Sequence, residues 1–256
     1  MDYNIKKDLL FAKDILDLTD EKFSEFLGVS RMTLYRWINE EVKPNDKMLE
    51  QIYNNLYKQN IHLNDVKQEL YKTKENKNHL ILFHGAKNKI IGQPSIEYSE
   101  NNKDFSKGFY LGVDIRQSAS FVFSYKKSSV YVFDFNLSKV KIVEFDVSKN
   151  WMLLVAYYRG RLDEYKDSKL LKNLLKKTQG ADVIIAPIAD NTMYSILNDF
   201  IEGEITDEQC YNALSANRLG KQYIFLNDKI INSNLKMIDS QEKQEMIREL
   251  APGIIL

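Results

Sequence analysis

The spacing of apolar residues changes at about residue 75, and this change constrains the fold more than any other feature of the chain. Before it, apolar residues recur every three or four positions, as at Leu9, Leu10, Ile15 and Leu16, which is typical of helices. A polar run without any apolar period, residues 71–78, then separates the two patterns. Beyond it, short segments rich in β-branched and aromatic residues predict strands.

Six segments beyond the polar run have the composition of strands, and five helical stretches lie among them. The expected strands are 80–83, 108–111, 130–135, 141–145, 183–186 and 223–226, and the expected helices are 116–125, 151–161, 168–178, 192–202 and 207–216. Their irregular order lacks regular strand–helix–strand alternation, which favours an α+β fold. We therefore expect an all-α domain over residues 1–75, an α+β domain over 79–235 and a helical tail over 236–256.

The N-terminal region carries the signals of two short helices joined by a turn. Thr19 is expected to cap one helix, Gly28 to supply a tight turn, and Ser30 to cap a second helix over residues 31–39. This order resembles the phage-repressor type of helix-turn-helix over residues 19–44. A further helix over residues 46–57 is expected to close the bundle.

The resemblance implies DNA binding through the second helix and its flank. The implied contact residues are Arg31, Thr33, Tyr35, Arg36 and Lys43. Residues 1–75, however, carry 12 basic and 14 acidic residues, whereas DNA readers usually present a basic face. Docking onto a protein, or onto the second domain, therefore stays open as the alternative.

The composition of the whole chain excludes several classes of function. With 36 basic and 36 acidic residues, the charge predicts no general affinity for nucleic acid or for anionic lipid. Cys210 is the only cysteine, so no internal disulfide can form, and His62, His79 and His84 are too dispersed for a structural zinc site. The N-terminus lacks a signal-peptide pattern and the longest apolar run, residues 151–158, is too short to cross a bilayer. We expect a cytoplasmic protein without a membrane partner.

Three distant segments each combine one polar side chain with apolar neighbours. Residues 82–86, 108–112 and 221–225 are expected to be strands or strand edges that carry His84, Tyr110 and Gln222 respectively. These residues resemble the histidine, the tyrosine and the third-strand polar residue that line the NAD pocket of ADP-ribosyltransferases.

The resemblance extends over residues 79–235, which look like an uncharacterised bacterial family assigned to the ADP-ribosyltransferase fold. The matching blocks are Asp104-Phe105-Ser106-Lys107-Gly108-Phe109-Tyr110-Leu111, with Ser106 in place of a glycine, then Gln117 with Ala119, Trp151 with Arg159, Ile188-Ala189-Asp190-Asn191, and Lys221-Gln222-Tyr223-Ile224-Phe225. Their order along the chain makes the match more specific than any single block. It implies a split β-sheet domain with flanking helices.

The resemblance also implies a role for each site residue. His84 would bind a ribose hydroxyl of the adenosine half, and the Gly85 backbone would approach the nicotinamide amide. Tyr110 would stack on the nicotinamide, and Gln222 would contact the ribose beside the scissile bond. Phe121 is implied as a further NAD contact.

The implied function is that of an NAD-dependent mono-ADP-ribosyltransferase, the toxin or effector of a bacterial toxin–antitoxin or phage-defence system. Its implied partners are NAD, a macromolecular acceptor (protein or nucleic acid), a neutralising antitoxin protein, and DNA through residues 19–44. Repressor-type modules also often form homodimers.

Gln222 leaves alternatives open, because glutamine carries no charge and cannot deprotonate an acceptor. Either the acceptor needs no base, or a carboxylate such as Asp190, with the accessory residue Asn191 beside it, or Glu204 supplies one, or the domain binds NAD without transferring it. The last case describes a helix-turn-helix regulator that senses NAD or a nucleotide, and hydrolysis of NAD is a third outcome. Taken singly, His84, Tyr110 and Gln222 are ordinary core or edge residues, Asp190-Asn191 is a helix-capping turn, and Trp151 and Arg159 serve packing and a salt bridge.

Overall fold

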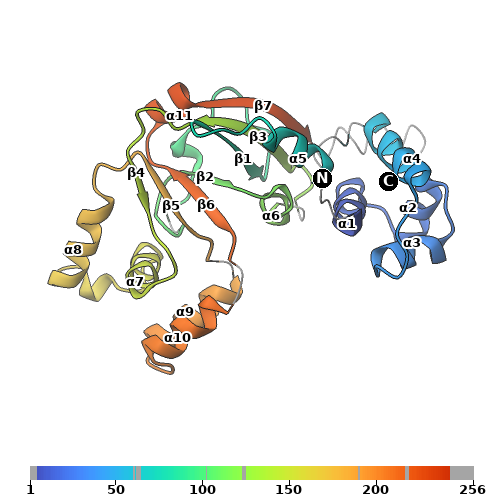
Figure 1. Ribbon diagram of the computed structural model, residues 1–256. Coiled ribbons are helices and arrows are strands. Elements are labelled where there is room, and N and C mark those ends of the chain that lie inside the picture. The colour runs from blue at the N-terminus through green and yellow to red at the C-terminus, as the bar shows by residue number, and fades with distance from the viewer. Residues whose placement is uncertain are drawn as a thin grey trace. The chain divides into compact units, whose positions relative to one another are not determined.

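The computed structural model describes residues 5–59, 61, 65–101, 103–122, 125–189, 191–216 and 219–242 (Figure 1). These residues form two compact units, which are described separately. Unit 1 consists of the described residues within 1–90, 114–135 and 237–256, and unit 2 of those within 91–113 and 136–236. None of the helices in the described part of the chain combines the length and the apolarity that crossing a membrane requires.

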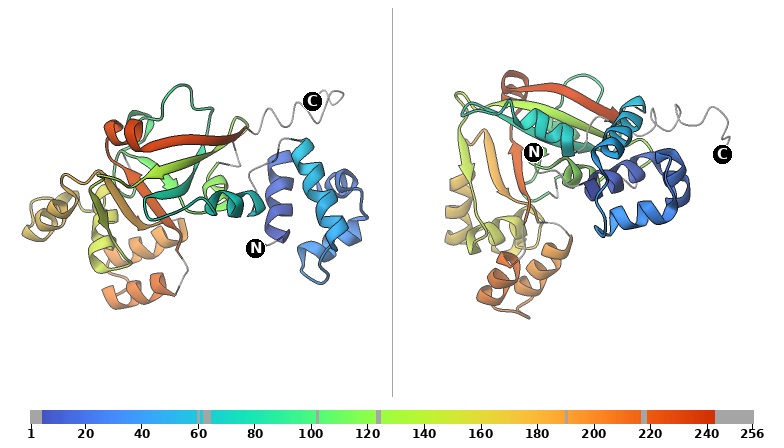
Figure 2. Two further views of the ribbon diagram at one scale, coloured as in Figure 1. Left: turned by 45° about the horizontal axis from the view of Figure 1, so that its top comes forward. Right: turned by 45° about the vertical axis from the view of Figure 1, so that its right-hand side comes forward.

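Unit 1 contains the N-terminal helices and three strands. Its helices are α1 (Ile5–Leu16), α2 (Asp20–Leu27), α3 (Arg31–Ile38), α4 (Asp46–Lys58), α5 (Asp65–Lys72) and α6 (Ile115–Ser120). Its strands, β1 (His79–Ala86), β3 (Ser129–Asn136) and most of β7 (Leu235–Glu242), lie in the order β1-β3-β7. The first four helices gather in one bundle, drawn in blue in Figure 2.

The expected caps of the N-terminal helices are present. Thr19 accepts a hydrogen bond from the Lys22 backbone N–H at 3.4 Å, and Ser30 accepts one from the Thr33 N–H at 3.1 Å. Gly28 ends α2 in the left-handed conformation, with φ of 71°, which glycine adopts without strain. Local sequence signals therefore determine where α2 ends and α3 begins.

A single hydrophobic core joins the helix bundle to the strands of unit 1. Leu9, Phe23 and Leu34 from the helices belong to the same buried cluster as Phe83 from β1 and Val132 from β3. Gln68 of α5 also accepts a hydrogen bond from the Ile115 backbone N–H at 2.7 Å. The change of period near residue 75 therefore lies within one hydrophobic core.

Unit 2 contains four strands in the order β4-β5-β6-β2. They are β2 (Phe109–Gly112), β4 (Ile142–Glu144), β5 (Val183–Pro187) and β6 (Lys221–Phe225). Its helices are α7 (Lys149–Tyr158), α8 (Lys169–Thr178), α9 (Asn191–Ile201), α10 (Asp207–Ser215) and α11 (Asp228–Asn234), with short 3-10 helices at Ile96–Tyr98 and Asp163–Tyr165. β4 is parallel to β5, whereas β6 is antiparallel to both β5 and β2, so the sheet is mixed.

One face of this sheet packs against helices. Ile184 of β5 and Ile224 of β6 belong to the same buried cluster as Trp151 of α7 and Leu197 of α9. Trp151 is among the largest fully buried side chains. The mixed sheet and the helices on it confirm the predicted α+β class.

All six expected strands and the five expected helices are found, with shifts at their ends. The helix expected over 116–125 is shorter, because α6 ends at Ser120. The sequence did not reveal α5, α11 or β7. The helical tail predicted over 236–256 is wrong for residues 236–242, which belong to strand β7 (Leu235–Glu242), while residues 243–256 lie outside the described residues. The apolar residues of this segment, Leu235, Met237 and Ile238, fit neither period strictly, so pairing with β3 decides its conformation.

Candidate functional site

The pairing of β2 with β6 brings two of the predicted site residues to the same face of the sheet of unit 2. Tyr110 lies opposite Ile224, and Gly112 lies opposite Gln222. Opposite residues of an antiparallel pair share a face, and side chains two positions apart do so as well. Tyr110 and Gln222 are therefore diagonal neighbours on the helix-covered face, where Ala186 of β5 is paired with Gln222 on the other side.

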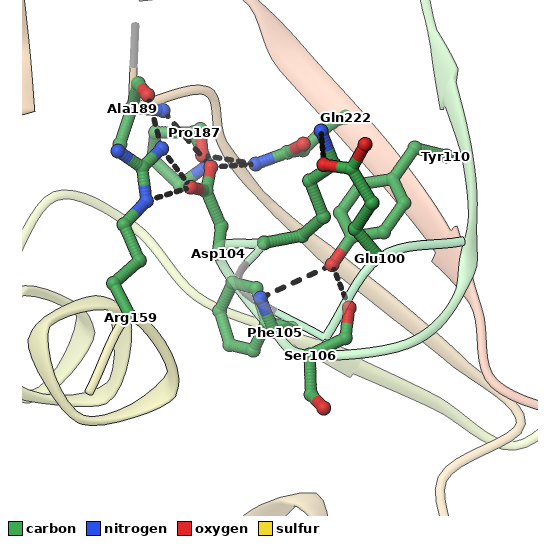
Figure 3. Close-up of polar contacts among 10 residues, drawn as sticks. Glu100, Asp104, Phe105, Ser106, Tyr110, Arg159, Pro187, Ala189 and Gln222 are labelled. Atoms are coloured by element: carbon green, nitrogen blue, oxygen red, sulfur yellow. Dashed lines mark hydrogen bonds and ion pairs between the residues drawn. The ribbon is translucent and has the colours of Figure 1, made fainter. Parts of the chain in front are cut away.

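Gln222 belongs to a buried polar cluster (Figure 3). Its side chain is 6% exposed, and its amide nitrogen donates to Asp104 Oδ2 at 2.8 Å and to the Pro187 carbonyl oxygen at 2.9 Å. Both partners are acceptors, so the NH2 group must face them. The Oε1 atom has no hydrogen-bond partner among the residues that the structure describes. The carboxamide therefore keeps one acceptor that these contacts do not use.

Asp104 connects Gln222 to Arg159. Arg159 follows α7 as its C-cap and donates from Nε to Asp104 Oδ1 at 2.9 Å and from Nη2 to the same oxygen. Oδ2 accepts from Gln222 and from the Ala189 backbone N–H at 3.2 Å. Within the described residues all polar contacts of this carboxylate therefore come from donors. The end of α7 also suits a cation, because the helix dipole is negative there.

Two further contacts hold the guanidinium of Arg159. Its Nη2 donates to the Ala189 carbonyl oxygen at 2.8 Å, and its Cζ lies 4.2 Å from the centroid of the Tyr194 ring on α9. The arginine side chain is 19% exposed and that of Asp104 is 7% exposed. This is a largely buried ion pair, and contacts from several segments define its position.

The loop before β2 fixes the ring of Tyr110. Its hydroxyl donates to the Ser106 carbonyl oxygen at 2.7 Å and accepts from the Phe105 N–H at 3.2 Å. Burial raises the pKa of this phenol above its ordinary value, so the hydroxyl stays protonated and able to donate. The ring, packed beside the core of unit 2, therefore has a defined orientation.

The backbone restricts the residue type at two positions of this loop, Ser106 and Gly108. Ser106 has a φ of 62°, in the left-handed region that glycine adopts without strain. Gly108 has no room for a side chain, because a Cβ would lie 2.6 Å from Ile224 Cγ2 and 3.1 Å from the Phe225 carbonyl oxygen. The block is thus shaped by the close approach of β2 to β6.

The other predicted NAD-contacting residues belong to unit 1. His84 is half-buried on β1, and Phe121, which follows α6, is 53% exposed. A Cβ at Gly85 would collide with the Ser118 carbonyl oxygen of α6. Gly85 therefore has a packing reason of its own: the close approach of α6 to β1.

The accessory residues are only partly described. Asp190 lies outside the described residues, and the side chain of Asn191 does as well, although α9 begins there. Glu204 is exposed in the turn between α9 and α10.

On α3 and the turn after it, Arg31, Tyr35, Arg36 and Lys43 are exposed. Thr33 is half-buried, and its hydroxyl lies 2.9 Å from that of Ser30, so it takes part in the cap.

Along the sequence, Asp104, Arg159, Ala189 and Gln222 belong to four separate blocks that no local pattern links. The structure joins all four in one hydrogen-bonded cluster. The sequence carries a signal for such a site, because each block places one polar residue or a turn beside apolar residues. Their mutual contacts nevertheless depend on how β2, α7, β5 and β6 pack.

Comparison with known proteins gives one match. The model of a family described as protein of unknown function (DUF3990) matches residues 80–237. No curated protein matches the chain, and no solved structure matches it. The matched range contains the whole Asp104–Arg159–Gln222 cluster and covers more than half of the 256 residues, so the chain belongs to the DUF3990 family.

Proposed function

We propose that the protein is an NAD-dependent mono-ADP-ribosyltransferase that acts as the effector of a toxin–antitoxin or phage-defence system. One observation carries the proposal: a ring held in place, Tyr110, and an acceptor oxygen without a protein partner among the described residues, Gln222 Oε1, lie on one face of adjacent strands. A flat ring suits stacking on a pyridine ring, and a fixed acceptor suits a ribose hydroxyl.

The proposed reaction breaks the bond between the ribose anomeric carbon and nicotinamide, and the electron pair leaves with nicotinamide. A nucleophilic atom of the acceptor then bonds to the anomeric carbon and loses its proton. The transition state resembles that of glycoside transfer, with positive charge on the ribose. Tyr110 would orient the nicotinamide, Gln222 the adjacent ribose, and His84 the adenosine ribose. Gln222 offers a dipole rather than a charge, so Asp190 or Glu204 would have to take the proton, or water would take it from an acceptor that is nucleophilic without help.

The test follows label from the adenylate half of NAD and measures nicotinamide release, with and without bacterial extract. Wild-type protein is expected to transfer label to an acceptor, and Tyr110→Ala and His84→Ala are expected to lower transfer by roughly 10²-fold. Tyr98→Ala is the matched control, since Tyr98 is a tyrosine of unit 2 that is 80% exposed. Equal labelling by all four proteins would remove Tyr110 and His84 from the mechanism. Nicotinamide release without labelled acceptor would indicate hydrolysis.

A second candidate is a regulator that senses NAD through the same residues without catalysis. It is favoured by the neutral side chain at position 222 and by the exposed basic residues of α3, Arg31 and Arg36. Under this alternative, NAD would change the affinity for DNA, and no nicotinamide would be released. DNA binding measured with and without NAD therefore separates a regulator from a transferase.

The role proposed for residues 19–44 is DNA binding, and an antitoxin protein or a second copy of the chain are the other proposed partners. Replacing Arg31 and Arg36 by alanine should weaken binding to all DNA sequences and reduce the salt slope by about 1 for each phosphate that is no longer neutralised. Lys58→Ala, at the end of α4, is the control. An unchanged salt slope in the double variant would favour protein docking.

A further inference from the structure

We propose that Asp104, held by Arg159, is a positioning residue that orients the carboxamide of Gln222, and that this cluster restricts position 222 to an uncharged side chain. The inference rests on the proposed function only for the identity of the ligand. The orientation itself follows from contacts within unit 2.

The orientation of the carboxamide follows from the chemistry of its two partners. Asp104 Oδ2 at 2.8 Å and the Pro187 carbonyl oxygen at 2.9 Å both accept hydrogen bonds and can donate none when Asp104 is ionised. A flipped amide would place Oε1 against these two oxygens with no proton between any of them, which costs the desolvation of each unpaired group. The NH2 group is therefore fixed inward, and Oε1 is the atom presented to a ligand.

The same contacts exclude a carboxylate at position 222. A glutamate there would bring a second negative charge to a site whose nearest groups are a carboxylate and a carbonyl oxygen. Arg159 offers no compensation, because both nitrogens that point into the cluster already serve Asp104 and the Ala189 carbonyl oxygen. An additional buried charge without its own partner is strongly unfavourable.

Several elements contribute charged and titratable groups around position 222. They are Asp104 from the loop before β2, Tyr110 from β2, Arg159 after α7 with the Tyr194 ring of α9 against its guanidinium, and Glu100, which Figure 3 draws beside the cluster. One guanidinium faces one carboxylate at the cluster, so the charges balance only while residue 222 is neutral. Glu100 is itself paired with Lys103 at 3.4 Å.

For the proposed transferase, Gln222 thus supplies an uncharged hydrogen-bond acceptor, Oε1, whose orientation is fixed. A ribose hydroxyl that donates to Oε1 would be oriented, while removal of a proton from the acceptor would fall to another group. This distinguishes the site from one that carries glutamate at the same place.

The decisive variant is Gln222→Glu, with Gln93→Glu as the matched control on an exposed loop residue of unit 2. The melting temperature of each is measured from pH 5 to pH 9. The cluster should raise the pKa of the introduced carboxyl above its unfolded value of about 4.3. A raised folded-state pKa means that stability is retained at low pH and lost as pH rises. For each unit by which the pKa of the introduced carboxyl rises, the melting temperature of Gln222→Glu should fall by about 3–5 °C relative to Gln93→Glu at high pH.

The exchanged pair Asp104→Asn with Gln222→Glu tests the positioning contact directly. The amide introduced at position 104 can donate to the carboxylate introduced at position 222, and the total charge beside Arg159 is unchanged. Part of the pH-dependent loss should therefore disappear in the double variant, while the introduced carboxylate still faces the Pro187 carbonyl oxygen and the Ala189 N–H loses its acceptor. If Gln222→Glu does not fold at any pH, recovery of folded protein in the exchanged pair supports the inference. An exchanged pair that stays unfolded while Asp104→Asn alone folds would overturn it.

Binding of NAD, followed by calorimetry, is the second readout. The dissociation constant of Gln222→Glu should increase roughly tenfold per pH unit above the pKa of the introduced carboxyl. Only the protonated carboxyl can take the place that the Gln222 carboxamide occupies beside Asp104, and its fraction falls roughly tenfold per pH unit. Wild type and Gln93→Glu should show no such dependence. A pH profile of Gln222→Glu that parallels Gln93→Glu in both stability and binding sinks the inference. Absence of NAD binding by wild type, beside the expected stability profile, would instead remove the proposed function and leave the positioning intact.

Discussion

Arg159 and Asp104 are 55 positions apart, and the arginine donates from both Nε and Nη2 to one oxygen of the carboxylate. The pair is largely removed from solvent, with side chains 19% and 7% exposed. Its other hydrogen bonds reach the turn after β5 and, through Gln222, the strand β6. The pair therefore couples four segments of unit 2 that the chain itself keeps apart.

Removing the guanidinium should leave the Asp104 carboxylate buried without a counter-ion. We expect Arg159→Ala to lower the free energy of unfolding by about 3–5 kcal/mol. Arg161→Ala is the matched control, since Arg161 contacts Glu202 at 3.4 Å with side chains 42% and 58% exposed, and should cost about 1 kcal/mol or less. Urea unfolding, with m-values that stay constant between the proteins, measures the free energy of unfolding of both variants. Equal losses of stability in Arg159→Ala and Arg161→Ala would contradict the role of the buried pair.

Two buried serines of unit 1 should respond oppositely to alanine. Ser129 is 2% exposed and its hydroxyl has no hydrogen-bond partner among the described residues, whereas the Ser118 hydroxyl donates to the Phe83 carbonyl oxygen at 3.1 Å. Ser129→Ala should stabilise the protein by about 1 kcal/mol, because it removes an unpaired buried group. Ser118→Ala should destabilise it by a similar amount. Thermal unfolding of the two variants decides, and a loss of stability in both would refute the assignment for Ser129.

Gly85 should tolerate no side chain. A Cβ there meets the Ser118 carbonyl oxygen, which is backbone and cannot turn aside, so Gly85→Ala should cost about 1–3 kcal/mol or more. Gly203→Ala provides the comparison, because that position is open but has a φ of 78°, and should cost only about 1 kcal/mol of backbone strain. Denaturant unfolding of both variants tells the two mechanisms apart. A Gly85→Ala protein as stable as wild type would show that α6 moves freely relative to β1.

Cys210 should be unreactive in the folded protein. It is fully buried in α10, and burial, with a smaller contribution from Asp199, raises the pKa of its thiol from 9.0 to about 11. The unfolded chain ionises first, so this stabilising contribution is present below about pH 9 and is lost as pH rises towards 11. A thiol reagent at pH 8 is expected to label Cys210 only in denaturant. Rapid labelling in native buffer would mean that α9 and α10 separate readily.

Local sequence signals predicted much of the fold correctly. Thr19, Gly28 and Ser30 act through neighbours within a few residues, so their roles as caps and turn follow from the local sequence. The strands were found for the same reason, since their composition differs from that of the polar segments around them. Strand β7 was not predicted, because its apolar spacing is ambiguous and its pairing partner β3 lies about 100 positions earlier.

The candidate site was only partly predictable. Tyr110 and Gln222 could be chosen from their blocks, but the sequence offered no reason for a glutamine at position 222. That reason is Asp104 and the Pro187 carbonyl oxygen, which lie 118 and 35 positions away and require a donor between them. The salt bridge expected for Arg159 likewise depends on a partner distant in the sequence, Asp104.

By itself the sequence determined the helical start of this protein, the change to strands after residue 75 and the caps, because these depend on residues close together in the chain. Tertiary structure alone decided that the N-terminal helices share a core with β1 and β3, and that Asp104, Arg159 and Gln222 meet. The physical reason is that a buried polar group takes its role from the donors and acceptors that packing brings to it, and those arrive from distant segments.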